Sequence, residues 1–355
     1  MTATQRVFDL DDLSSWRKWY ARLEEPGPYH HPDYVGFVAG WLEHEHSARL
    51  FVLEDGDDLV YYPFMVRSLD TVPFAPDADL DLSTYADIVS SWYYGGPVAT
   101  GPGAVELADR FVKRFGDYCA DHDIVAEFVR FDPYVGNHEH FGGLEPEYER
   151  ETVWVDLAQS EAALWDGFEK RNRNAIRQAQ DTDLVVEPTS DIDDVAAFHR
   201  IYRNAMEAKG AAEHYRFDQE FFAELLANEE LASLLVARYE DDVVGGSVIV
   251  HDDSIAHDYL RASNPDYWDM RVNNLICYEA LMYARATGRD QFDFQGGRPG
   301  VFKFKKSFSP KRATFHVAKR VHMPETYNRL VGAAERAGID TDTDYFPKYR
   351  VEQSN

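Results

Sequence analysis

Residues 293–308 read Asp-Phe-Gln-Gly-Gly-Arg-Pro-Gly-Val-Phe-Lys-Phe-Lys-Lys-Ser-Phe, and this segment says most about the fold and the function of the chain. The residues that lead into it, Gln291 to Phe294, predict a buried strand. The glycines let the backbone approach a ligand without a side chain in the way. Cations then mix with apolar anchors (Phe302, Lys303, Phe304, Lys305, Lys306 and Phe308). Such a segment is typical of a site for a negatively charged donor or acceptor, but also of a β-turn and an edge strand with solvated lysines.

The rest of the chain is strongly acidic. It has 355 residues, of which 63 are acidic and 36 are lysine or arginine, so its net charge is −27 at pH 7. Because the acids are dispersed, we expect a halophilic protein, in which salt screens the repulsion between surface carboxylates. An acidic surface that binds a basic partner is the alternative. The aromatic content of 14% excludes a disordered acidic chain.

Length and cysteine content limit the architecture and the compartment. A chain of 355 residues is too long for one ordinary core, so two domains are expected. Cys119 and Cys277 are the only cysteines and lack metal-type spacing. A soluble protein of the reducing cytoplasm is expected, with no membrane span, no metal and no tightly bound cofactor.

The two halves of the chain repeat one order of predicted elements, which is hairpin, helix, strand. In the first half these elements are Leu50 to Leu53, Leu59 to Val66, Ala104 to Cys119 and Ile124 to Phe131. In the second half they are Ser233 to Tyr239, Val243 to Val250, Asn274 to Thr287 and Gln291 to Phe294. This repeat predicts a duplicated α+β, or mixed α/β, domain.

A polar stretch rich in turn residues, Gly142 to Glu151, predicts the domain boundary. The expected domains are residues 1–147 and 148–325, followed by a C-terminal helix and tail at residues 326–355. After the boundary the pattern predicts a short strand, Thr152 to Asp156, and one helix that Ser160 caps and that continues to Ala179.

That helix carries a basic face. Lys170, Arg171, Arg173 and Arg177 lie close together, and no acid occurs from Lys170 to Gln180. Arg173 and Arg177 share one side of the helix because they are four residues apart. The face is either a ridge that contacts phosphate groups or an ordinary solvated surface. We expect the phosphate ridge, because a local excess of cations is unusual in so acidic a chain.

The segment Ile255 to Asn264 predicts a strand whose alternation places His257, Tyr259 and Arg261 on one face, either as a cleft wall or as a solvated face. Asn273 or Asn274 is expected to cap the helix that follows, and a helix N-terminus attracts anions. The chain lacks the glycine-rich motifs of P-loop and dinucleotide-binding enzymes and the serine elbow of hydrolases, which argues against these classes.

Three motifs together resemble the Fem-type aminoacyltransferases of the wider GNAT-like acyltransferase superfamily. They are the 293–308 segment with its Gly-Gly and Phe304-Lys305 elements, the basic helix from Lys170 to Ala179, and the turn Tyr93-Tyr94-Gly95-Gly96-Pro97. The resemblance implies two tandem GNAT-like domains. It also implies transfer of an acyl or aminoacyl group from an activated donor, commonly aminoacyl-tRNA, to an amine on a cell-envelope precursor.

The resemblance implies roles for particular residues. Phe304 and Lys305 would lie at the activated carbonyl, with Lys305 stabilising the developing negative charge. Asp293 would either relay a proton or fix the turn. The remaining candidates would contact donor or acceptor: Arg173, Arg177 and Arg298 at phosphates, and Tyr259, Arg261, Asn274 and Gln295 in the cleft.

Three functions are compatible with these patterns. The first is an N-acyltransferase that uses aminoacyl-tRNA or acyl-CoA as co-substrate and acts on a small-molecule or envelope-precursor amine. The second is an acyl-CoA-dependent N-acetyltransferase of a small amine. The third is a non-catalytic protein of the same fold that binds RNA or a ligand. No DNA partner is expected.

Overall fold

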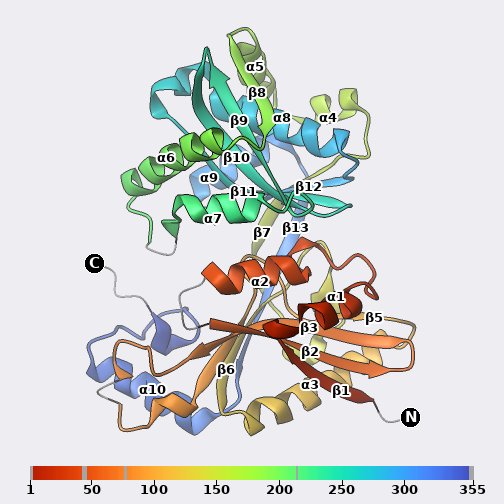
Figure 1. Ribbon diagram of the computed structural model, residues 1–355, viewed down its shortest axis with the longest axis vertical. Coiled ribbons are helices and arrows are strands. Elements are labelled where there is room, and N and C mark those ends of the chain that lie inside the picture. The colour runs from red at the N-terminus through yellow and green to blue at the C-terminus, as the bar shows by residue number, and fades with distance from the viewer. Residues whose placement is uncertain (1–2, 42–45, 76–77, 213–214, 352–355) are drawn as a thin grey trace. The chain divides into compact units, whose positions relative to one another are not determined.

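The computed structural model describes residues 3–41, 46–75, 78–212 and 215–351. The chain forms two compact units (Figure 1). The first unit comprises Met1–Glu149 and Thr314–Asn355, and the second comprises Arg150–Ala313. Each unit combines helices with one sheet, as the α+β prediction requires.

This division differs from the expected one at the C-terminal end. Residues from Thr314 onward belong to the first unit, whereas the sequence pattern suggests that the second domain continues to residue 325 and that residues 326–355 form a separate tail. The reason is β13, which pairs with β6 of the first unit from Val317 to Val321. A strand that joins a sheet far away in the sequence gives no local signal.

The sheet of the first unit has the strand order β1-β2-β3-β4-β6-β13, with β5 paired to β3. Neighbouring strands are antiparallel except for β4 and β6, which are parallel and are connected through helix α3. The bounds are β1 Thr4–Asp9, β2 His46–Asp55, β3 Asp58–Ser68, β4 Ala86–Ser90, β5 Val98–Thr100, α3 Ala104–Asp121, β6 Ile124–Arg130 and β13 Arg312–Val321.

The sheet of the second unit repeats this plan in the order β8-β9-β10-β11-β12-β7. Only β11 and β12 are parallel, and helix α8 connects them. The bounds are β7 Glu147–Asp156, β8 Leu184–Thr189, β9 Ala232–Tyr239, β10 Asp242–His251, β11 Ile255–Ser263, α8 Val272–Ala286 and β12 Gln291–Gln295. Strands β6 and β12 therefore hold the same place in their sheets, as the predicted duplication requires.

Helices cover the sheets. In the first unit they are α1 Leu13–Tyr20, α2 Pro32–Trp41, α3 and α10 Pro324–Arg336, and in the second α4 Glu161–Gly167, α5 Lys170–Gln180, α6 Ile192–Ala208, α7 Gln219–Leu226, α8 and α9 Pro299–Lys305.

The expected cap at Ser160 is confirmed, because its Oγ accepts from the Ala163 amide at 3.3 Å. The expected single helix from Ser160 to Ala179 is wrong: the chain is extended at Phe168 and Glu169 and forms two helices.

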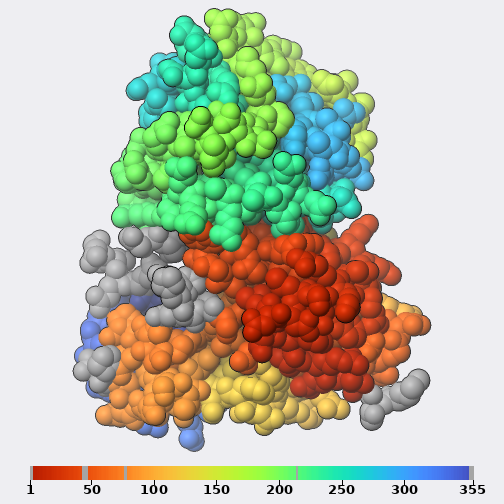
Figure 2. Space-filling view, viewed as in Figure 1, coloured from red at the N-terminus to blue at the C-terminus, as the bar shows by residue number. Residues whose placement is uncertain are grey.

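Two glycines set the distance between the helices and the sheet of the second unit. A Cβ on Gly245 would lie 3.0 Å from the Ile276 side chain of α8, and one on Gly246 would lie 2.8 Å from the Phe198 ring of α6. Because neighbouring strand residues face opposite sides, α8 and α6 pack on opposite faces of β10. Helices α6 and α7 cover much of the face of this unit that Figure 2 shows.

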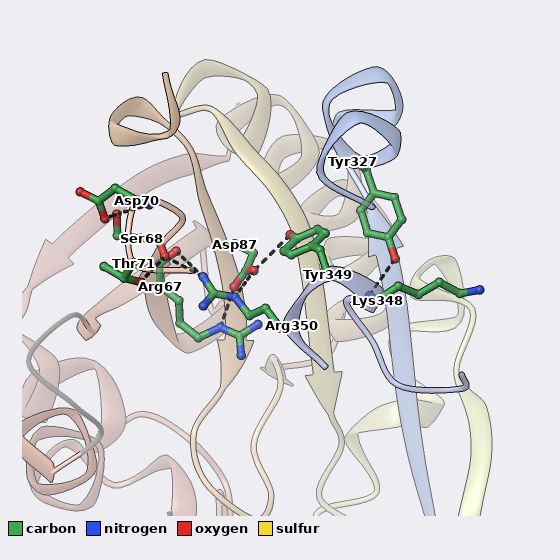
Figure 3. A network of polar contacts seen from close by, with 9 residues as sticks. All are labelled: Arg67, Ser68, Asp70, Thr71, Asp87, Tyr327, Lys348, Tyr349 and Arg350. Carbon is green, nitrogen blue, oxygen red and sulfur yellow. Dashed lines mark hydrogen bonds and ion pairs between the residues drawn. The ribbon is translucent and has the colours of Figure 1, made fainter. Parts of the chain in front are cut away.

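A buried ion network fixes the C-terminal segment within the first unit (Figure 3). The Asp87 carboxylate is fully buried and accepts from Arg67 Nε and Arg350 Nε, each at 2.6 Å. The Tyr349 hydroxyl donates to the same carboxylate at 3.1 Å. Burial opposes the charge on Asp87, but its two arginine partners outweigh burial and lower its pKa.

Within the described residues, no helix is long and apolar enough to cross a membrane.

Candidate functional site

The segment after β12 is helical and not extended. Arg298 precedes helix α9, Pro299 occupies its first turn, and a 3-10 turn over Lys306–Phe308 follows. Proline suits a first helical position because its fixed φ matches the helix and its missing N–H is not needed there. The Phe308 ring packs 5.0 Å from that of Phe294 on β12. The alternative interpretation of an edge strand with solvated lysines is therefore wrong, because residues 299–308 are helical and Lys305 is buried.

Lys305 is buried in this helix. Only 7% of its surface is exposed, and its Nζ donates to the Gly296 carbonyl at 2.9 Å. Burial lowers the pKa of the Lys305 ammonium to about 8, an effect that Arg261 reinforces and that Asp258 and Asp293 oppose. Lys306, by contrast, is exposed, and its Nζ lies 5.3 Å from the centroid of the Phe302 ring.

Strand β11 brings charged groups to this lysine. Its pairing with β10 shifts register between Val248 and Ile249. This bulge breaks the strict alternation on which the expected common face of His257, Tyr259 and Arg261 rests. Arg261 instead pairs with Asp258 at 3.4 Å, and Asp258 accepts from Ser247 Oγ at 3.0 Å.

Arg261 also reaches the neighbourhood of α9. Its guanidinium lies 5.4 Å from the centroid of the Phe304 ring, a cation–π contact, and it contacts the Cys277 sulfur. Arg298 is exposed at the start of α9. Burial is the main cause that lowers the pKa of Lys209, and the charges of Arg261 and Arg298 lower it further. Arg261 and Arg298 therefore both act on Lys209, and Arg261 also acts on Lys305. Tyr259 is buried on β11.

A cleft of about 640 Å³ opens beside Phe304. Its polar lining comes from α5, α8 and the segment around α9. Three of the lining residues are cationic, four carry amide side chains, and none of the described lining residues is acidic: Arg171, Asn172, Asn174, Ala175, Gln178, Arg271, Asn274, Gly300, Lys303, Phe304 and Ser307.

Two asparagines hold the walls of this cleft together. Asn274 Nδ2 donates to Asn172 Oδ1 at 2.8 Å, and Asn172 Nδ2 donates to the Ser307 carbonyl at 3.2 Å. The expectation that Asn273 or Asn274 caps α8 is wrong, because the helix begins at Val272. Arg271 precedes it with φ of 62°, so its backbone is left-handed and takes the capping position.

The basic helix α5 contributes to the cleft through Arg171, which the sequence analysis placed on the basic face but did not include among the site residues. Arg173 Nη1 donates to carbonyls of residues 165, 166 and 168, the shortest at 2.6 Å, so Arg173 serves the end of α4. The Arg177 guanidinium lies 5.1 Å from the centroid of the Trp165 ring. Neither is among the cleft-lining residues, whereas Arg171 is.

Arg271 and Lys303 are the other cleft cations that sequence reasoning did not include among the site residues. A signal existed for Arg271, because it immediately precedes the predicted helix. No group of three or more histidine, cysteine, aspartate or glutamate side chains in the described part of the chain is arranged to hold a metal ion.

Comparison with known proteins agrees with this architecture. Residues 167–306 match the family described as an acetyltransferase (GNAT) domain. A solved structure of FemX is 13% identical, with a TM-score of 0.67, over 92% of this chain and 99% of that chain. A tandem GNAT protein from the clavulanic acid biosynthesis pathway is 12% identical, with a TM-score of 0.50, over 90% and 98% of the two chains.

A third solved structure is the C-terminal domain of a putative lysylphosphatidylglycerol synthetase from Agrobacterium fabrum. It is 11% identical, with a TM-score of 0.54, over 87% of this chain and 91% of that chain. No curated protein matches the sequence.

The fold is therefore that of the tandem GNAT-like proteins, with one unit built on each half of a duplicated plan. Residues 167–306 match the GNAT acetyltransferase domain family, and the predicted fold of two tandem GNAT-like domains is confirmed.

Proposed function

We propose that this protein is an N-acyltransferase that moves an acyl or aminoacyl group from an activated, phosphate-bearing donor to an acceptor amine. The observation that carries the proposal is the cleft of the second unit, with Arg171, Arg271 and Lys303 in its lining and no acid among the described lining residues. In a chain of net charge −27, such a surface is what phosphate groups would select. Apart from Ser307, the cleft-lining residues also lie within the part of the chain that matches the GNAT domain.

Both candidate donors carry phosphates that suit this lining. Acyl-CoA is the co-substrate typical of GNAT domains, and aminoacyl-tRNA is the donor that the Fem-type resemblance implies. The glycine-free approach to α8 differs from a backbone cradle for pyrophosphate, so side chains would supply the contacts. Arg271 and the amides of Gln178 and Asn274 are placed to do so.

The reaction is attack of the acceptor nitrogen on the donor carbonyl carbon. A C–N bond forms, and the C–S bond of a thioester or the C–O bond of an aminoacyl ester breaks. The amine loses a proton and the leaving group takes one. Lys305 has three N–H donors, of which one serves Gly296, and the others would stabilise the oxyanion that develops on the carbonyl oxygen. With a pKa of about 8, Lys305 is mostly protonated at pH 7.

The neighbouring groups have supporting roles in this proposal. Phe304 lines the cleft and would place the donor carbonyl near Lys305. Arg261 and Arg298 would face the anionic part of the acceptor, together with Lys209. The acceptor is a small-molecule or envelope-precursor amine.

Direct binding in molar KCl tests the proposal and separates the donors. Acyl-CoA and aminoacyl-tRNA are titrated in turn into the wild type, into Arg171→Ala and into Arg203→Ala, which removes an exposed arginine on α6 as a charge-matched control. The proposal expects one donor to bind and support product formation, and Arg171→Ala to weaken its binding by about tenfold. Arg203→Ala should bind normally.

Each of the other outcomes selects a different function. Turnover with acetyl-CoA and a small amine alone identifies an acetyl-CoA-dependent enzyme. RNA binding without turnover identifies the non-catalytic alternative. If neither donor binds, the proposal is wrong.

A further inference from the structure

We propose that His257 and Asp293 are positioning residues that hold the Lys305 ammonium in place through the turn formed by Gln295 and Gly296. The inference rests on the proposed function, because it assigns these residues to the lysine that the proposal places at the reacting carbonyl. It also decides between the two roles that the sequence allows for Asp293.

The first contact of this chain is buried in the sheet. Strands β11 and β12 are parallel, and His257 pairs directly with Asp293. His257 Nδ1 donates to Asp293 Oδ2 at 3.0 Å, and both side chains are completely buried. A buried carboxylate needs such partners, because leaving it without them is costly. The imidazole therefore fixes one oxygen of Asp293.

The second oxygen of Asp293 fixes the turn. Asp293 Oδ1 accepts from the backbone amide of Gln295 at 2.6 Å, the two-residue contact typical of an aspartate turn. Gln295 has φ of 63°, a left-handed conformation that residues other than glycine rarely adopt. The contact stabilises this conformation and so fixes the direction of the chain at Gly296.

The last contact reaches the lysine. The Gly296 carbonyl accepts from Lys305 Nζ at 2.9 Å, so the place of the ammonium depends on where the turn points that carbonyl. Charged groups that act on Lys305 come from two strands: Asp258 and Arg261 on β11, and Asp293 on β12. Asp293 therefore acts on Lys305 twice, through the turn and through its charge.

A positioning role and a proton relay predict different results for two substitutions of Asp293. Asparagine keeps an oxygen that can accept from the Gln295 amide, whereas it cannot carry a proton as a carboxylate does. Asp293→Asn should retain kcat to within about tenfold, and Asp293→Ala, which releases the turn, should lower kcat by up to about a hundredfold. A relay would give equal losses in both variants.

His257 offers a second pair of variants. The side-chain amide of His257→Asn can replace Nδ1 as the donor to Asp293, whereas His257→Ala cannot. We expect His257→Asn to retain most of kcat and His257→Ala to lose about as much as Asp293→Ala. Asp252→Ala is the matched control, because Asp252 Oδ1 likewise accepts from backbone amides two and three residues later, Ser254 and Ile255, in a turn at the other end of β11. Its kcat should be unchanged.

A second measurement does not depend on the donor. The Lys305 ammonium is titrated by ¹⁵N NMR, with its signal assigned from the spectrum of Lys305→Arg. In Asp293→Asn the lysine should titrate at lower pH than in the wild type, because a carboxylate that favours the ammonium has been removed. An unchanged lysine titration in both Asp293→Asn, which loses the charge, and His257→Ala, which releases the Asp293 carboxylate, overturns the inference even if Asp293→Ala fails to fold.

The two proposals fail in different ways. If Lys305→Met retains the wild-type rate, the proposed function of Lys305 is wrong while the NMR result still reports the contacts. If Lys305→Met is inactive but Asp293→Ala has a normal kcat and a normal lysine titration, only the positioning inference is wrong.

Discussion

The N-termini of helices α3 and α8 occupy equivalent places in the two units, yet the charged side chains beside them have opposite signs. Each helix connects two parallel strands, β4 to β6 and β11 to β12. At α3 an acid of the chain itself occupies the end: Asp58 Oδ1 accepts from the Gly103 amide at 2.7 Å. At α8 the cleft-lining residues Arg271 and Asn274 lie at the helix start.

The Asp58 carboxylate also packs tightly against the backbone at the start of the first helix. A Cβ on Gly101 or Gly103 would lie 2.6 Å or 2.5 Å from an oxygen of Asp58, so both glycines serve the approach of this carboxylate. The positive end of α3 is therefore neutralised from within, whereas that of α8 is reinforced by cations. We infer that only the second unit takes a phosphate-bearing donor and that the first unit has a supporting role.

Among the substitutions that test this difference between the units, the largest effect on kcat is expected at Lys305, the proposed oxyanion-stabilising residue of the second unit. Lys305→Ala should lower kcat by about a hundred- to a thousandfold, about 2.7–4 kcal/mol, because it removes a charged donor to the oxyanion. Lys306→Ala is the control, because that lysine is exposed and one residue away. Steady-state kinetics of both variants provide the check. Normal rates in both variants would show that the reaction takes place at another site.

The buried Lys305 ammonium should also lower the free energy of unfolding. Lowering its pKa from 10.5 to about 8 corresponds to about 3 kcal/mol at neutral pH, because the buried ammonium is disfavoured. This penalty is present below pH 8 and is relieved as pH approaches 10.5. Lys305→Met should therefore be at least as stable as the wild type at pH 7 in denaturant unfolding, although it is inactive. A large loss of stability in Lys305→Met would show that the hydrogen bond to Gly296 stabilises the fold by more than burial of the ammonium destabilises it.

A smaller effect is expected in the second unit on acidification. Burial, with the nearby Arg289, lowers the pKa of His251 in the second unit to about 4. The folded state binds this proton less tightly than the unfolded state, so the second unit should lose up to about 3 kcal/mol as pH falls from 6.5 toward 4. In the first unit burial likewise lowers the pKa of His30, whereas Asp87, whose pKa is lowered, keeps its contribution until pH falls below its ordinary value of 3.8.

Hydrogen exchange at pH 7, 5 and 4 measures this loss. Amides of β9 and β10 should lose protection as pH falls through this range. His251→Gln should reduce this acid sensitivity, since glutamine has no proton to gain in this range. Equal loss of protection in the wild type and in His251→Gln would contradict the assignment of acid sensitivity to His251.

Sequence patterns were sufficient for the repeated plan. The apolar runs and turns that predict β2, β3, β9 and β10, and the helices between the parallel strands, are local signals that tertiary packing reinforces. They could not reveal β13, because its pairing with β6 joins residues almost two hundred positions apart. The same limit explains why residues 314–355 belong to the first unit.

The candidate site was predicted in part. Phe304 and Asn274 line the cleft, whereas Lys305 is buried and is not among the lining residues. The burial of Lys305 depends on how α9 packs, which alternating lysines and phenylalanines did not indicate. Arg173 looks like a phosphate ligand in the sequence because its neighbours are basic. In the structure its guanidinium donates to carbonyls at the end of α4, where Gly167 is the last helical residue and marks the break in the sequence.

The most direct test of the central claim compares two single substitutions, Asp58→Ala and Arg271→Ala, by calorimetric titration with the donor that binds the wild type. The account predicts one site per chain. Arg271→Ala should weaken binding by about tenfold through loss of a charge-assisted contact. Asp58→Ala should leave binding unchanged and lower the free energy of unfolding by about 1 kcal/mol, the usual net contribution of one hydrogen bond. Donor binding that survives in Arg271→Ala but weakens in Asp58→Ala would contradict the account.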